Sequence, residues 1–215
     1  MLSIIICSVK PDLLSQVKNN INKTIGIKYE IIAFDNRVES LGICQVYNLC
    51  AKKAIYNNLL FIHEDILFHS NNWGSELITL LDNKDVGLIG MAGAIYKSAE
   101  PTPWVALPSK YYRSNAFFDE KNRNKNTYLE NQEVVVVDGM FLATRKEIWQ
   151  KIPFSDQLKG FHMYDIDYSY QIKKNNYKII VPKNIKVQHL SHGSFDDIWY
   201  QESCKWHKKK NYLFF

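Results

Sequence analysis

Three ionisable residues interrupt an apolar stretch in the first third of the chain. His63, Glu64 and Asp65 follow the apolar residues 59–62 and precede the apolar residues 66–68. Placing charges in such a run costs several kcal/mol unless a metal, a partner or a solvent-lined cleft compensates them. If residues 59–62 form a parallel strand, the cluster lies at its carboxyl end, where open α/β sheets bind ligands. The cluster therefore predicts a site for Mg²⁺ or Mn²⁺ with a phosphate-bearing ligand. A solvated loop after a strand is the alternative.

Ionisable side chains also follow other segments that we expect to be strands: Asp35, Asp138 and His189. Asp165 and Asp167 lie near the start of an expected helix, whose N-terminal dipole favours negative charge. Residues two apart on a helix do not share a face. We therefore expect one of these two carboxylates to face a cleft while the other caps or pairs elsewhere.

The elements that must position these residues indicate a parallel α/β sheet. The β-branched, apolar segment 3–8 predicts a strand buried on both faces. A turn, a helix capped by Asp12 and a second strand at 29–34 follow, which predicts a right-handed crossover. No glycine-rich loop follows the first strand, which argues against a dinucleotide fingerprint or a P-loop. Further strands are expected at 86–94, 133–137, 178–181 and 185–189. Further helices are expected at 40–56, 73–81, 146–151 and 195–210, and the helix that begins near Asp165 is expected to end by Asn175.

Two features of these elements allow alternative interpretations. Asn48, within the expected helix 40–56, either faces solvent or points into the site. Residues 96–133 lack periodicity, which favours a functional loop, with disorder as the alternative. The aromatic residues Trp104, Tyr111 and Tyr112 either offer faces on which sugar rings or bases stack, or pin this loop to the core.

Composition bounds the class of protein. The 215 residues, 46% hydrophobic and 23% charged, suit one domain with its own core. The net charge of +5 comes partly from Lys208, Lys209 and Lys210. A solvated cluster is the common interpretation of such a run, so no nucleic-acid partner is expected. The aromatic residues of the same tail also allow peripheral contact with an anionic membrane surface, or contact with a partner subunit.

The cysteines and the absence of targeting signals indicate a cytoplasmic protein. No apolar stretch is long enough to span a bilayer, and no basic region precedes the first one. The four cysteines form no CxxC pair and no zinc-finger spacing, so reduced thiols are expected: Cys7, Cys44, Cys50 and Cys204.

The order of these motifs resembles that of the glycosyltransferase family 2-like proteins, especially short bacterial members with a strand ending in a His-Glu/Asp-Asp cluster. The resemblance extends from segment 3–8 to His189. It implies the GT-A fold, an α/β architecture with a Rossmann-like, mostly parallel central sheet flanked by helices and a small additional antiparallel sheet. It also implies one domain over 1–215, with a nucleotide-binding half (1–95), an irregular loop (96–133), an acceptor and catalytic half (134–194) and a C-terminal helix and tail (195–215).

The resemblance implies roles for individual residues. The 63–65 cluster matches the family's Asp-x-Asp motif, with His63 in place of the first acid, so that Asp65 contacts the metal. His189 resembles the late histidine that completes metal coordination. Residues 164–167 resemble the Glu-Asp-x-Asp segment, with Tyr164 replacing the Glu, which makes Asp165 the general base. Donor binding is implied for Ser8 and Asp35 (base and ribose), Glu64, Asp65, Asp138 and Gly139.

The implied activity is transfer of a sugar from a UDP-, dTDP- or GDP-sugar to a carbohydrate or glycolipid acceptor in bacterial polysaccharide or glycolipid assembly. Mn²⁺ or Mg²⁺ at Asp65 would stabilise the leaving diphosphate. Asp165 would take the proton from the acceptor hydroxyl, and single displacement would invert the configuration.

Two other functions remain open from the sequence. A zinc hydrolase could use His63, Asp65 and His189, although no HExxH motif is present. The second is a non-catalytic protein with a degenerate site that binds a nucleotide or a carbohydrate. The departures from the family pattern at His63 and Tyr164 support it.

Overall fold

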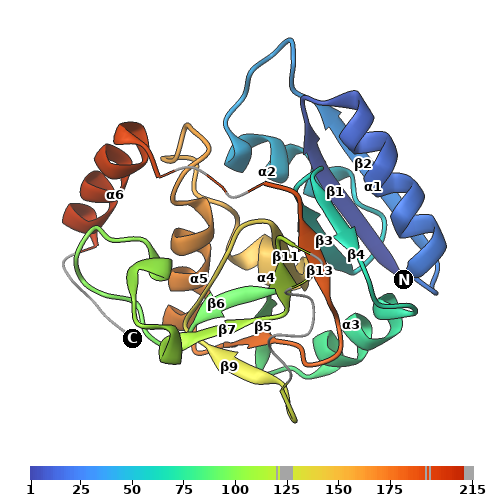
Figure 1. Cartoon of the computed structure of the whole chain (residues 1–215). Helices are drawn as coiled ribbons and strands as arrows, with labels where there is room; N and C mark the ends of the chain where they lie inside the picture. The colour runs from blue at the N-terminus through green and yellow to red at the C-terminus, as the bar shows by residue number, and fades with distance from the viewer. Residues whose placement is uncertain (120, 122–127, 192, 194, 211–215) are drawn as a thin grey trace.

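The centre of the protein is a seven-stranded sheet with the strand order β2-β1-β3-β11-β5-β12-β9 (Figure 1). The computed structural model describes residues 1–119, 121, 128–191, 193 and 195–210. Strands β2, β1 and β3 are parallel, as are β5 and β12, whereas β11 and β9 are antiparallel to their neighbours. The mostly parallel sheet predicted from the sequence is confirmed. Its strands are β1 (Leu2–Ser8), β2 (Tyr29–Asp35), β3 (Asn58–Ile62), β5 (Val86–Ile89), β9 (Gln132–Val134), β11 (Phe141–Arg145) and β12 (Lys178–Val181).

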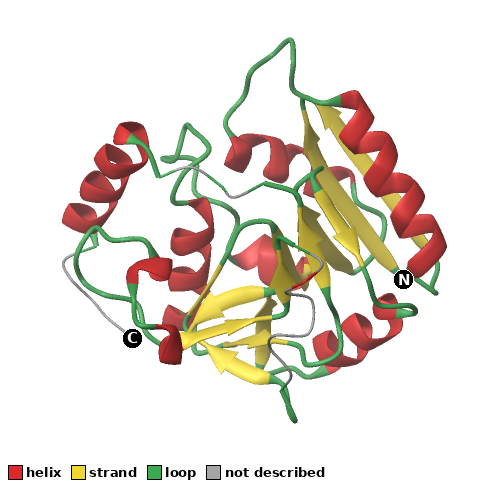
Figure 2. Ribbon diagram, in the orientation of Figure 1, coloured by secondary structure: helices red, strands yellow, loops and turns green. Residues whose placement is uncertain are grey.

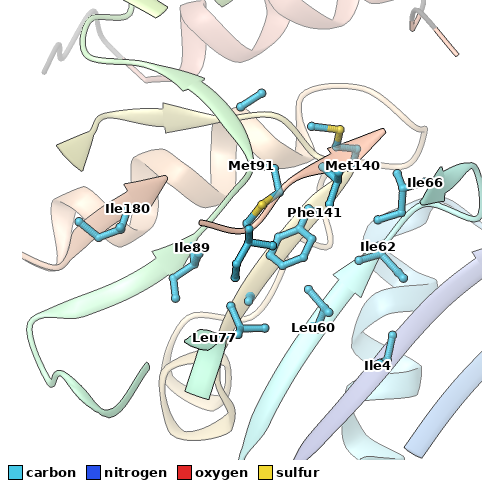
Figure 3. Close-up of a cluster of buried hydrophobic side chains, with 14 of the residues drawn as sticks. Ile4, Leu60, Ile62, Ile66, Leu77, Ile89, Met91, Met140, Phe141 and Ile180 are labelled. Carbon is cyan, nitrogen blue, oxygen red and sulfur yellow. The ribbon is translucent and has the colours of Figure 1, made fainter. Parts of the chain in front are cut away.

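Helices cover both faces of this sheet (Figure 2), which explains why the successive residues Ile4, Ile5 and Ile6 of β1 are all apolar and buried. Successive strand side chains point to opposite faces. Ile4 and Ile6 accordingly pack with α1 and α3 in one hydrophobic cluster. Figure 3 shows part of this cluster. Ile5 packs with α2, α4 and α5 on the other face. The helices are α1 (Pro11–Thr24), α2 (Ile43–Lys53), α3 (Trp73–Asp82), α4 (Lys146–Lys151), α5 (Tyr164–Lys174) and α6 (Asp197–Lys209).

Helix α1 starts differently from the sequence prediction. Lys10 is the N-cap residue and makes no capping hydrogen bond through its side chain, and Pro11 is the first helical residue. Proline suits this position because its missing N–H would have had no intrahelical partner. Asp12 therefore lies in the first turn, where its charge complements the helix dipole. The predicted helix and the parallel pairing of the strands on either side of it are confirmed, but the predicted cap was wrong.

Two segments predicted as single strands each divide between two sheets. Residues 86–94 form β5 and β6, and residues 132–137 form β9 and β10. The first break lies at Gly90, where a Cβ atom would lie 2.5 Å from the Cβ of Val137. The small strands make two three-stranded sheets, β10-β6-β7 and β4-β13-β8. Their bounds are β4 (Ile66–Phe68), β6 (Ala92–Ala94), β7 (Tyr112–Ser114), β8 (Ala116–Phe117), β10 (Val136–Val137) and β13 (Val187–His189).

Within 96–133, the described residues contain short elements rather than an unstructured loop. Two 3-10 turns, Trp104–Ala106 and Ser109–Tyr111, precede β7 and β8. Trp104 is buried and packs edge-on against Tyr112, with ring centroids 5.6 Å apart. Both rings also line the cavity described below. They therefore hold the 96–133 segment against the core and also form part of the cavity wall.

Asn48 has neither of the two placements considered from the sequence. Its side-chain oxygen accepts hydrogen bonds from Trp149 Nε1 and from the backbone N–H of Phe154, and its amide donates to the Phe154 carbonyl. It therefore ties α2 to the segment that follows α4. Among the described residues, no helix has the length and apolar character needed to cross a membrane. The four cysteines are free thiols, and tail residues 211–215 lie outside the described part of the chain.

Candidate active site

The end of β3 and the start of β11 bring two predicted motifs side by side. Ile62 pairs with Phe141 across the two strands. Just beyond this pair, the backbone N–H of His63 donates to the carbonyl of Met140 at 3.1 Å. The 63–65 cluster therefore lies at the carboxyl end of a strand, as predicted, and next to the turn that contains Asp138 and Gly139.

His63, Asp65 and His189 form a cluster that could hold a metal ion. His189 arrives on β13, which pairs with β4 so that His189 lies opposite Ile66. Asp65 Oδ1 is 3.2 Å from His189 Nε2 and 3.9 Å from His63 Nδ1. Each residue offers one ligand atom, and these atoms lie within 4.8 Å of one another. One cation could therefore contact all three residues.

The electrostatics of this cluster favour a cation. Burial opposes ionisation of Asp65, but hydrogen bonds from His189 and Ser191 hold the pKa of its carboxyl below the usual value. Burial and the neighbouring His189 imidazole lower the pKa of His63. An ionised carboxylate beside neutral imidazole is the protonation state that metal ligation requires. The donor set fits Mn²⁺, and it also fits Zn²⁺.

Asp165 lies in the first turn of α5 and lines the same cavity as His63 and His189. Its carboxylate accepts hydrogen bonds from the backbone N–H of Gly139 at 3.2 Å and of Ile166 at 2.8 Å. Burial, and secondly the charge of Asp138, raise its pKa to about 7. The side chain is thus held in one orientation while its affinity for a proton is raised.

Gly139 must be a glycine because Tyr164 occupies the space beside it. A Cβ atom on Gly139 would lie 2.1 Å from the hydroxyl oxygen of Tyr164. That hydroxyl is 2.6 Å from His63 Nε2. The two positions at which the chain departs from the family pattern, His63 and Tyr164, therefore contact each other. Nothing in the sequence signals this contact.

Ser8 and Glu64 contact each other at the carboxyl ends of β1 and β3. The Glu64 carboxylate accepts hydrogen bonds from Ser8 Oγ at 2.6 Å and from the backbone N–H groups of Val9 and Lys10. It thereby holds the loop between β1 and α1. Asp35 lies opposite Ser8 at the end of β2, and its exposed carboxylate pairs with Arg37 at 2.5 Å. Ser8, Asp35 and Glu64 are not among the residues that line the cavity described next.

The cavity joins the metal-ligating cluster to the acid of α5. Its volume is about 530 Å³, and its polar residues include His63, Asp138, Asp165 and His189. Asp165 and His189 thus line one cavity, whereas Asp65 is not among the lining residues and lies behind His189, with which it is in contact. The wall also carries aromatic side chains. Trp104 and Tyr112 had been considered from the sequence as stacking faces, whereas Phe118, Phe161, Phe195 and Trp199 were not predicted.

The second acid of α5 faces away from the cavity. Asp167 accepts hydrogen bonds from Trp206 Nε1 at 2.8 Å and pairs with Lys210 Nζ at 2.9 Å. It therefore holds helix α6 against α5. The two carboxylates have the separate roles that the helical spacing predicts.

Comparison with known proteins places the chain in a family. Residues 3–211 match a family described as glycosyltransferase-like. The chain belongs to this family. No curated protein matches the chain at a significant level.

Solved structures with the same fold are GT-A glycosyltransferases, which confirms the predicted fold. GalNAc-T7 with UDP, GalNAc and Mn²⁺ superposes with a TM-score of 0.63 at 13% identity, over 88% of this chain and 43% of that chain. The mannosyltransferase PcManGT from Pyrobaculum calidifontis, with GDP-Man and Mn²⁺, superposes with a TM-score of 0.63 at 12% identity, over 98% of this chain and 63% of that chain. A mutant of Drosophila β-1,4-galactosyltransferase 7 with manganese, UDP-Gal and xylobiose superposes with a TM-score of 0.54 at 13% identity, over 94% of this chain and 79% of that chain. The chain thus spans less than two thirds of the first two proteins.

Proposed function

We propose that the protein is a divalent-metal-dependent glycosyltransferase that moves a hexose from a nucleotide-sugar to an acceptor hydroxyl with inversion of configuration. One observation carries the proposal: the Asp165 carboxylate, with its pKa raised to about 7, lines the same cavity as His63 and His189, which with Asp65 form the metal-ligating cluster. A base and a cation site facing one hollow are what this transfer needs. The Mn²⁺, UDP and GDP-Man in the structures of the same fold support this choice of ligands.

Asp65 and His189 would hold the metal, with His63 as a third ligand. A divalent cation held by these residues would supply stabilisation of the negative charge that develops on the leaving diphosphate. Asp65 would bind through its carboxylate, whose pKa lies below the usual value. Manganese or magnesium is the proposed ion.

Asp165 acts as the general base. A base is most effective when its pKa lies near the working pH, and burial raises the pKa of Asp165 to about 7. The backbone N–H groups of Gly139 and Ile166 fix the direction of its oxygens. The carboxylate takes the proton from the acceptor hydroxyl as the hydroxyl oxygen attacks the anomeric carbon, and the bond to the diphosphate breaks on the opposite side. This single displacement inverts the configuration.

The donor occupies the edge of the sheet at the ends of β1, β2 and β3. Asp35 and Ser8 contact the ribose and base, Glu64 holds the loop that borders the nucleotide, and Asp138 and Gly139 border the donor sugar. Residues 1–95 then form the nucleotide-binding half and residues 134–194 the acceptor and catalytic half of a single domain. The donor is a UDP-, dTDP- or GDP-sugar.

The aromatic wall of the cavity suits a carbohydrate or glycolipid acceptor. Pyranose rings and lipid chains both bury apolar surface against such side chains. Phe118, Phe161 and Phe195 line the cavity and remain about half exposed, so they lie where an acceptor enters. Such an acceptor suits a cytoplasmic enzyme that assembles bacterial polysaccharide or glycolipid and touches the membrane surface peripherally.

The zinc hydrolase is the competing function, because the same three ligands suit zinc. Membership of a glycosyltransferase-like family favours the transferase. Metal analysis separates the two: tightly held stoichiometric zinc would favour the hydrolase. Weak Mn²⁺ or Mg²⁺ binding that strengthens with a nucleoside diphosphate would favour the transferase.

A screen of nucleotide-sugars by thermal shift, with and without Mn²⁺, tests the proposal. A ligand that binds only the folded chain raises its melting temperature. We expect one donor to stabilise the protein only when Mn²⁺ is present, and the purified protein to hydrolyse or transfer that sugar. A protein that binds the donor but never releases its nucleoside diphosphate would instead be the non-catalytic binding protein.

A further inference from the structure

The contact between His63 and Tyr164 joins the two places where this chain differs from the family pattern. Tyr164 begins helix α5 and His63 follows β3, so residues 101 positions apart meet at 2.6 Å. Gly139 leaves the space in which the tyrosine hydroxyl lies. An acid at position 63 would need no such partner, whereas an imidazole has two nitrogens that must be assigned different roles.

The geometry of His63 gives its two nitrogens different neighbours. Nε2 faces the Tyr164 hydroxyl, and Nδ1 faces Asp65 Oδ1 at 3.9 Å. The nitrogen that faces the cluster can bind a cation only through its lone pair, which puts the ring proton on Nε2. That N–H then needs an acceptor, because an unpaired buried donor is costly. The Tyr164 oxygen is that acceptor among the described residues, and Tyr164 is only 5% exposed.

We propose that Tyr164 is a positioning residue that fixes the Nε2–H tautomer and the orientation of His63, so that His63 Nδ1 serves as a ligand of the catalytic divalent ion. This inference rests on the metal dependence of the proposed function and goes beyond it. A ligating histidine whose second nitrogen has a fixed partner binds metal more tightly. Exchanging an acid for an imidazole also moves the preference of the site from Mg²⁺ towards Mn²⁺ and Zn²⁺.

The chain offers a matched control for the test. Tyr47 is fully buried and packs against the Tyr164 ring with centroids 6.1 Å apart. Its hydroxyl has no hydrogen-bond partner within the described residues. Tyr47→Phe and Tyr164→Phe therefore each remove one buried phenol oxygen from the same aromatic cluster, but only the second removes a partner of His63.

The experiment titrates the intact protein and both variants with Mn²⁺ alone, by calorimetry or by electron paramagnetic resonance. We expect Tyr164→Phe to weaken Mn²⁺ binding by about 10- to 100-fold and Tyr47→Phe to leave it unchanged. In the Zn²⁺-loaded protein labelled with ¹⁵N-histidine, the His63 Nε2–H resonance should be visible in the wild type and in Tyr47→Phe, and lost by exchange in Tyr164→Phe. His63→Asp should raise the affinity for Mg²⁺ relative to Mn²⁺.

Equal Mn²⁺ affinity in the wild type and in Tyr164→Phe would overturn the inference and leave the proposed transferase intact. Equal weakening in both tyrosine variants would overturn it as well, because the effect would then come from packing. A wild-type protein that binds no divalent ion, with or without a nucleoside diphosphate, would overturn both the inference and the metal-dependent function. Melting temperatures of the metal-free variants establish that each chain is folded.

Discussion

Replacing Asp165 with asparagine tests the base assignment most directly. The amide keeps the size of the side chain, but its single oxygen can accept from the backbone N–H of Gly139 or of Ile166 and not from both, and it cannot take a proton. We expect the transfer rate at saturating donor to fall by about 10²- to 10⁴-fold, with donor binding retained. The wild-type rate should rise with pH up to about 7, where burial places the pKa of Asp165, because only the ionised carboxylate is a base.

The same substitution has a calculable effect on stability. Folding raises the pKa of Asp165 from 3.8 to about 7, first through burial and then through Asp138. Between these values the folded chain binds more protons than the unfolded chain, so the wild type loses stability as the pH rises through this window. The Asp165→Asn variant would show no such loss, because its amide does not titrate. Between pH 5 and pH 7 the gap between variant and wild type should therefore grow by about 2 kcal/mol, or roughly 4–8 °C in melting temperature for a chain of this size.

Thermal melts of both proteins in EDTA, at several pH values from 5 to 8, measure this gap without contributions from metal. Turnover assays with Mn²⁺ at the same pH values measure the catalytic effect. Undiminished turnover in the variant would refute the base assignment. A melting-temperature gap that stays constant with pH would show that Asp165 is not protonated in the way its surroundings require, and the reasoning from burial would be wrong.

Three further changes test the contacts that hold the site. Gly139→Ala places a Cβ where the Tyr164 hydroxyl lies, so we expect urea unfolding to show a loss of about 1–3 kcal/mol; unchanged stability would mean that Tyr164 moves freely. Glu64→Gln removes the charge that holds the β1–α1 loop and should cost about 1.5–3 kcal/mol in the same assay. Trp206→Phe removes the hydrogen bond to Asp167, so limited proteolysis should cleave near α6 faster than in the wild type; equal rates would contradict the anchoring role of that bond.

The sequence was sufficient for features that depend on local pattern. The apolar segment 3–8 identified a strand buried on both faces, because a run without polar alternation fits only such a strand. The strand–helix–strand order identified the parallel sheet and its crossover. The acids at strand ends followed from the cost of charge inside a core strand, and the placement of the 63–65 cluster at the end of β3 agrees with that reasoning.

Other features depended on which segments pair in space. Local pattern shows that residues 86–94 and 133–137 are strands, but it does not show that each divides between two sheets. The antiparallel strand β11, which lies between β3 and β5, was likewise not predicted as a strand of its own.

The site shows the same division. Residue types and their order indicated that acids and histidines gather at one edge of a sheet, because parallel strands present their carboxyl ends together. Only the tertiary structure decided that His63 Nε2 faces Tyr164 while Nδ1 faces Asp65, and that Asp167 anchors α6. The physical reason is that hydrogen bonds and pKa shifts act over a few ångströms, and the contacts that produce them join residues as far as 101 positions apart in the chain.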